Sequence, residues 1–199
     1  MDLWTASLSG MRWEQLFADL EAQAAAEEAA AELAEASSRA RAEHGSVLLA
    51  DRLRGSLGQE LSLRCRGAGE LAGRLVDVGV DWLLLVDGQG RELLVAAGAV
   101  SAVGGLAAVT AAAVPVGEVA RRLDLRRALR GLARDRATVS CLLDDGGVLA
   151  GTVDRVGADF LELAEHPLDA PRRRGAVTSV RAVPVRAVVA VRTSLPAVA

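Results

Sequence analysis

The feature that most constrains this chain is an internal repeat. A shift of 78 residues aligns residues 61–85 with residues 139–163 without a gap, and ten of the 25 positions are identical. The match places glycines, an aspartate and an aromatic position in the same order, which a biased composition does not easily reproduce. It resumes at residues 95–103 against residues 183–191, and residues 165–175 are extra in the second copy. A chain of 199 residues has room for two small domains, so the repeat predicts tandem copies of one domain.

Hydrophobic alternation with a period of two predicts five short strands in each copy. In the first copy these strands are predicted at residues 61–65, 71–78, 82–86, 91–95 and 100–103. A helix is predicted before each copy, at residues 47–57 and 118–134. Trp82 and its counterpart Phe160 are expected on the core side of their strands. The predicted fold is α+β and mostly β, with boundaries at 1–46 (arm), 47–104 (first unit), 105–116 (linker) and 117–199 (second unit).

The N-terminal arm is predicted to be one helix from Met11 to about Glu43, because Ala and Glu dominate it and both are strong helix formers. Residues 1–9 are expected to form a loose tail. Four large apolar side chains recur at i, i+3, i+4 and i+7 and define an apolar stripe: Trp13, Leu16, Phe17 and Leu20. This stripe either contacts a partner as a helix in a groove or packs on the chain's own domains, and the pattern allows both.

A helix followed by five short, bent strands resembles the Sm-like β-barrel fold of the Sm, LSm and Hfq families. The resemblance lies in an apolar strand, a Gly turn, a second strand with Gly73 or Gly151, and a third apolar strand, followed by two further strands. It covers everything after the arm and implies two tandem Sm-like units. The family holds RNA bases partly with an Arg-Gly pair before the last strand. Here Ala96-Ala97 and Pro184-Val185 occupy those places, so the family's nucleotide pocket is not expected.

Charge is distributed unevenly along the chain. Residues 1–46 hold three Arg and nine acids, whereas residues 117–199 hold fourteen Arg and ten acids. Arg binds phosphate through a bidentate fork and is never neutralised, so an Arg-rich surface could contact a nucleic-acid backbone. The alternative is an ordinary solvated face in a chain whose basic residues are all Arg. The candidate nucleic-acid contacts are Arg121, Arg122, Arg126, Arg127, Arg130, Arg134, Arg172, Arg173 and Arg174.

No constellation of residues predicts catalysis, a cofactor or a metal site. Cys65 and Cys141 fall on inward positions of strands, where a free thiol packs as a small hydrophobe. His44 and His166 have no Cys or acid at ligand spacing. The glycines at 67, 69 and 73 are followed by a strand pattern, whereas a dinucleotide loop needs a helix there. Asp81 and Asp159 precede strands and are expected to bond their own turns.

The expected function is that of a non-catalytic structural or interaction protein that forms a homo-oligomer through the arm and the strand edges. A dimer through the arm is the first expectation, and a ring through the edges the second. The alternative is an RNA- or DNA-binding regulator that contacts phosphates through Arg. No apolar run reaches the length of a membrane span and residues 1–10 lack a basic, apolar leader, so a cytoplasmic protein with no membrane association is expected.

Overall fold

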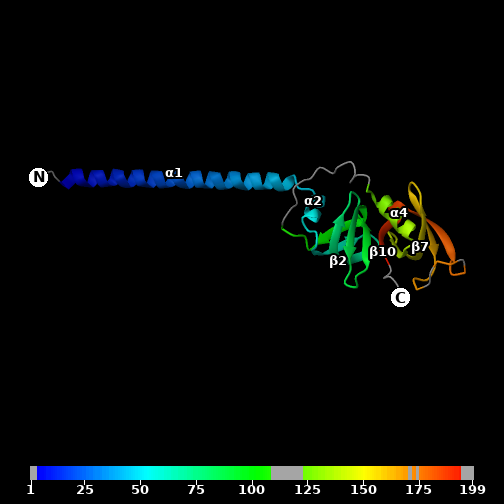
Figure 1. The fold of residues 1–199 in the computed structure, drawn as a ribbon. Helices are drawn as coiled ribbons and strands as arrows, with labels where there is room; N and C mark the ends of the chain where they lie inside the picture. The colour runs from blue at the N-terminus through cyan, green and yellow to red at the C-terminus, as the bar shows by residue number, and fades with distance from the viewer. Residues whose placement is uncertain (1–3, 109–122, 170–171, 174, 194–199) are drawn as a thin grey trace. The chain divides into compact units, whose positions relative to one another are not determined.

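The computed structural model describes residues 4–108, 123–169, 172–173 and 175–193. The chain divides into two compact units, Met1–Val47 and Leu48–Ala199. The first unit is a single long helix, α1 (Trp4–Gly45), and the second holds every strand (Figure 1).

Helix α1 confirms the predicted helical arm, but it begins at Trp4 rather than at Met11. No proline interrupts residues 4–45, and Gly10, the one glycine before the terminal Gly45, costs only about 1 kcal/mol relative to alanine, so the helix continues through it. All the side chains of α1 that the structure describes are exposed, the apolar stripe included. The stripe therefore remains an uncovered apolar face on a mainly alanine and glutamate helix.

In the second unit the structure describes two sets, each with one short helix and five strands. The predicted strands of the first copy are confirmed within two residues of their observed ends. The first set is α2 (Leu49–Arg54), β1 (Glu60–Cys65), β2 (Gly69–Val78), β3 (Trp82–Val86), β4 (Glu92–Ala96) and β5 (Val100–Gly104). The second set is α4 (Leu125–Asp135), β6 (Thr138–Leu143), β7 (Val148–Val156), β8 (Phe160–Glu165), β9 (Ser179–Pro184) and β10 (Val188–Thr193).

All ten strands pair antiparallel in one sheet with the order β5-β1-β2-β3-β4-β10-β6-β7-β8-β9. In each set the last strand pairs with the first, and the two sets meet where β4 pairs with β10; Figure 1 shows β10 between β2 and β7. The predicted α+β, mostly β class is confirmed. The sheet is open, however, and no pairing between described strands closes either set into a separate barrel, so the two barrels stay a prediction.

The second strand of each set is bent at the same place. The register shifts between Leu75 and Asp77 in β2 and between Val153 and Arg155 in β7. Such a bulge adds an unpaired residue and increases the local twist. Just before each bulge stands a glycine, Gly73 or Gly151, on which a Cβ would meet backbone of the next strand. The repeated glycine thus permits a close approach between strands.

The core of this unit takes alternate residues from β1, β2 and β3, as period-two patterning requires, and consecutive residues from β4 and β10, which are buried on both faces. Leu83 and Leu85 of β3 point inward and are almost fully buried, as are Leu161 and Leu163 of β8. This alternation corrects the expectation for Trp82: both it and Phe160 lie in the opposite phase and are partly exposed. Their rings lie instead over Gly79 and Gly157, where any Cβ would overlap them.

Candidate functional site

The junction between β4 and β10 is the first candidate site, because here one five-strand set joins the other. Val95 pairs with Ala190, Leu94 with Val191, and Leu93 with Arg192. Val95, Ala190 and Val191 are almost completely buried. The junction is therefore a strand-to-strand contact with an apolar, closed interior.

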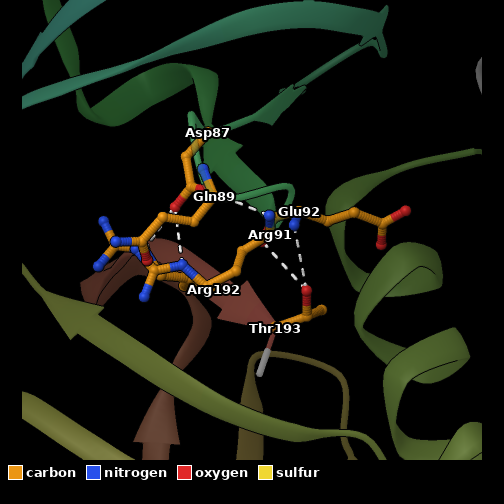
Figure 2. A network of polar contacts seen from close by, with 6 residues as sticks. All are labelled: Asp87, Gln89, Arg91, Glu92, Arg192 and Thr193. Atoms are coloured by element: carbon orange, nitrogen blue, oxygen red, sulfur yellow. Dashed lines mark hydrogen bonds and ion pairs between the residues drawn. The ribbon is translucent and has the colours of Figure 1, made fainter. Parts of the chain in front are cut away.

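A polar network closes one end of this junction (Figure 2). Asp87 accepts hydrogen bonds from the backbone N–H groups of Gln89 and Arg91 at 2.9 and 3.0 Å, and from Arg91 Nε at 2.8 Å. Its carboxylate also lies 4.0 Å from Arg192 Nε on β10. Burial raises the pKa of Asp87, but the hydrogen bonds from Arg91 and Gln89 and the charge of Arg91 outweigh it and lower the pKa. The network thus holds an ionised carboxylate in the turn between β3 and β4, beside Arg192 of β10.

Residues of the first set form hydrogen bonds with the start of helix α4, which belongs to the second set. Asp81 Oδ1 accepts the backbone N–H of Leu125 at 2.7 Å, and Trp82 Nε1 donates to the carbonyl of Leu123 at 2.8 Å. Asp124 caps the helix by accepting the N–H of Arg127 at 2.9 Å. The carboxylate of Asp81 therefore joins the two sets, a role that the turn interpretation missed.

A groove of about 610 Å³ lies between β3 and α4, and we call it the α4 groove. Its polar lining comes from Asp77, Asp124, Arg127, Arg130 and Arg134, and Trp82 forms part of its wall. The side chains of Arg127 and Arg130 donate no hydrogen bond to any residue that the structure describes. Burial raises the pKa of Asp124, but hydrogen bonds from Arg127 and Arg126 and the charges of Arg126 and Arg130 lower it overall.

A smaller hollow of about 160 Å³ shares Trp82 and Ala128 with the α4 groove. We call it the apolar pocket, because Leu84, Leu94, Leu132 and Val191 line it. These residues come from β3, β4, α4 and β10, so the pocket lies at the junction of the two sets. Sequence reasoning did not identify this pocket, because its walls are separate in the chain and meet only through strand pairing.

The predicted arginine surface is divided in the structure. Arg127, Arg130 and Arg134 line the α4 groove, whereas Arg126 is held by Asp124 and by the carbonyl of Ala158. Arg172 forms an ion pair with Asp154, which raises its pKa, and Arg173 is exposed. Arg121, Arg122 and Arg174 lie outside the described residues. Of the six predicted arginines that the structure describes, three are therefore gathered at one place.

The two outer strands of the sheet, β5 and β9, are its open edges. On β9 the side chains of Arg181 and Ala182 are exposed, whereas Leu93 and Leu94 at the repeat-related places on β4 are buried. Ala102 on β5 is exposed, and its counterpart Ala190 on β10 is fully buried. Residues that are buried on β4 and β10, at the inner junction, are thus exposed at the equivalent positions of β9 and β5, at the outer edges.

The two cysteines are free and buried, as predicted. Burial raises the pKa of Cys65, and it raises the pKa of Cys141 to about 12. A buried thiol that keeps its proton is a poor nucleophile, because the thiolate is the reactive form.

We therefore expect Cys141 to be silent toward a thiol reagent at pH 8 in the folded chain and to react after denaturation. The raised pKa also sets the pH dependence of stability. The unfolded thiol ionises at its ordinary pKa of 9.0, whereas the folded thiol ionises only at about 12. The free energy of unfolding should consequently fall as pH rises through this window. Urea unfolding of the wild-type chain and of Cys141→Ala from pH 8 to 11 checks this, and equal pH slopes for the two would contradict it.

His166, in the loop after β8, is buried and internally satisfied. Its Nδ1 lies 2.8 Å from the carbonyl of Pro167, which can only accept, and its Nε2 lies 2.9 Å from the Thr152 hydroxyl. The imidazole thus links the loop after β8 to Thr152 of β7 by a hydrogen bond. Among the described residues no group of three or more His, Cys, Asp or Glu side chains could hold a metal ion.

Comparison of the chain with protein-family models, with curated proteins and with solved structures finds no match in any of the three. Across the described part of the chain, no helix combines the length and the apolar character needed to cross a bilayer.

Proposed function

We propose that this chain is a non-catalytic assembly protein built from two tandem Sm-like units, and that copies join head to tail through their open strand edges. The observation that carries the proposal is the pairing of β4 with β10. That pairing joins the fourth strand of one set to the fifth strand of the other. The outer edges are a fifth strand, β5, and a fourth strand, β9, so a second copy can repeat the same junction.

The internal junction also supplies the register of the proposed contact. The repeat relates Val95 to Val183, Leu94 to Ala182, and Val191 to Val103. Because Leu94 pairs with Val191, we expect Ala182 of one copy to lie opposite Val103 of the next. Each new junction would pair N–H and C=O groups that an open edge otherwise leaves unpaired.

The helices support the same arrangement. Leu125 and Leu49 each stand four residues before the buried leucine of their helix, Leu129 or Leu53. Leu125 is 5% exposed where α4 meets the first set, whereas Leu49 is 54% exposed. A neighbouring copy that placed β9 against β5 would bring Phe160 toward Leu49, as Trp82 approaches the start of α4. Exposed apolar side chains at both ends of the sheet are thus explained by one contact.

A head-to-tail contact of this kind closes into a ring or extends as a filament, depending on the rotation between copies. We therefore expect the full chain at micromolar concentration to have a mass of more than two chains of 20.6 kDa. Light scattering during size-exclusion chromatography, over a hundredfold range of concentration, is the measurement. A mass of one or two chains throughout that range would refute assembly through the strand edges.

Phosphate-backbone binding is the second candidate function, and one observation favours it. Arg127 and Arg130 present guanidinium groups in the α4 groove that bond to no described acceptor. Against it, Arg126 and Arg172 are already held by Asp124 and Asp154. A titration with a labelled oligonucleotide at two salt concentrations distinguishes this candidate, since phosphate contacts weaken steeply with salt.

A further inference from the structure

The α4 groove combines cationic and apolar walls in one continuous surface. Arg127, Arg130 and Arg134 follow one another at i, i+3 and i+7 along α4, so they share a face of that helix. The apolar pocket adjoins this face through Trp82 and Ala128. A ligand that fills both parts needs acidic groups on one side and large apolar side chains on the other.

This combination favours an amphipathic acidic helix over a nucleic acid. A phosphate backbone satisfies guanidinium groups but offers no aliphatic or aromatic side chain for the pocket lined by Leu84, Leu94 and Leu132. An acidic helix satisfies both parts, and helix-in-groove recognition uses apolar anchors at i, i+3, i+4 and i+7. The charge of the groove also fits. Of its two carboxylates, Asp124 is paired with Arg126 and Asp77 accepts the N–H of Val78, so the guanidinium groups of Arg127 and Arg130 remain for an acidic ligand.

Helix α1 carries such a face. Its apolar stripe is uncovered, with Trp13 58% and Phe17 59% exposed, and Leu16 and Leu20 are exposed as well. Glu14, Asp19 and Glu21 lie in the same turns. The stripe spans two turns and then gives way to alanine and glutamate, so two arms could form an apolar seam only over this short length. A short groove with cationic walls fits it better than a second acidic arm.

The length of helix α1 gives its apolar stripe the reach to contact another copy. Because α1 is continuous, Phe17 lies roughly 40 Å along the helix axis from its end at Gly45. A stripe carried so far from the attachment point suits an exchange between molecules. We propose that the apolar stripe of α1 docks in the α4 groove of a second copy, with its large side chains in the apolar pocket and its acids on Arg127 and Arg130.

This contact extends the proposed assembly function, on which it rests, by adding the arm to the strand edges as a second contact surface. Two chains that exchange arms reciprocally make a closed, two-fold dimer. Strand-edge assembly is separate, since β5 and β9 contribute nothing to the groove.

The test uses the full chain with its own arm disabled by Trp13→Ala and Phe17→Ala, so that its grooves are free. The probe is a fluorescein-labelled peptide of residues 10–24, followed by anisotropy at 50 and 500 mM NaCl. We expect saturable binding that weakens at least tenfold in high salt. Adding Arg127→Glu and Arg130→Glu to the receptor should weaken it at least tenfold, and the milder Arg127→Ala and Arg130→Ala pair should weaken it in the same direction.

The matched control is Arg64→Glu with Arg173→Glu, an equal charge change at two exposed positions outside the groove, which should alter binding less than twofold. Circular dichroism confirms that each receptor is folded. Equal binding by the groove variants, or no saturable binding at 200 µM peptide, would overturn the proposal. So would groove-dependent binding of a 20-nucleotide RNA together with no binding of the peptide, an outcome that assigns the groove to phosphate.

A second measurement decides whether the arm comes from another copy. In a chain whose strand edge is blocked by Ala182→Pro, arm exchange should leave a dimer, and Arg127→Glu with Arg130→Glu should convert it to a monomer. A monomer with both arm and groove intact would overturn docking between copies. Failure of strand-edge assembly in the unmodified chain would not affect either result.

Discussion

Replacing Ala182 by proline is expected to reduce the assembled protein from a multimer to at most two chains. Val185 N–H donates to the carbonyl of Asp159 at 2.8 Å, and hydrogen-bonding positions alternate along an antiparallel strand. The N–H groups of Val183 and Arg181 therefore face β8, whereas that of Ala182 faces the open edge. Proline removes only this outward donor and leaves the inner ladder intact.

The reason for so large an effect is the position of Ala182 in the junction. Its repeat-related residue, Leu94, pairs with Val191 at the centre of the β4–β10 contact. Light scattering of Ala182→Pro should give a mass of no more than two chains at every concentration, and addition of Phe17→Ala should give 20.6 kDa. The control is Pro at Arg186, which is exposed just beyond β9 and should leave assembly unchanged. A multimer that survives Ala182→Pro would show that β9 is not the assembling edge.

Replacing Gly151 by alanine is expected to lower the free energy of unfolding by about 3 kcal/mol or more. A Cβ at Gly151 would lie 2.0 Å from the backbone oxygen of Ala164. The obstacle is main chain in a paired strand, so it cannot rotate away as a flexible side chain would. Relief requires β7 and β8 to separate at the Gly151–Glu165 pair, which breaks hydrogen bonds of the ladder.

Gly73 offers the parallel test and Gly88 the control. A Cβ at Gly73 would lie 2.6 Å from the backbone oxygen of Val86, so Gly73→Ala should destabilise the chain in the same way but less severely. Gly88 stands in a turn with no atom within 4 Å of such a Cβ, and Gly88→Ala should change stability by less than about 0.5 kcal/mol. Urea unfolding with a common slope measures all three. Equal urea midpoints for Gly151→Ala and Gly88→Ala would contradict the prediction, because they would show that β7 and β8 accommodate the extra Cβ without loss of stability.

The sequence by itself determined which segments form helices and strands. Period-two alternation located β1 to β3, because one face of each of these strands is buried and the other is not. The repeat located the close approaches at Gly73 and Gly151, since both copies need a residue without a side chain at the same bend. The burial of Cys65 and Cys141 followed from the same alternation. These are local properties, because a few neighbouring residues in the sequence determine each of them.

Only the tertiary structure decided which surfaces those elements share. Strand pairing joined β4 to β10, residues far apart in the chain, and so created the apolar pocket between Leu94, Leu132 and Val191. The same pairing placed Asp81 on the N–H of Leu125, where sequence reasoning expected a bond within its own turn. It also separated Arg127 and Arg130 from the ion-paired Arg172. Periodicity in the sequence indicates which face of a strand is buried. It does not indicate which strand pairs with which, because the backbone hydrogen bonds between strands can be made by any strand. Only the folded sheet specifies the paired neighbours.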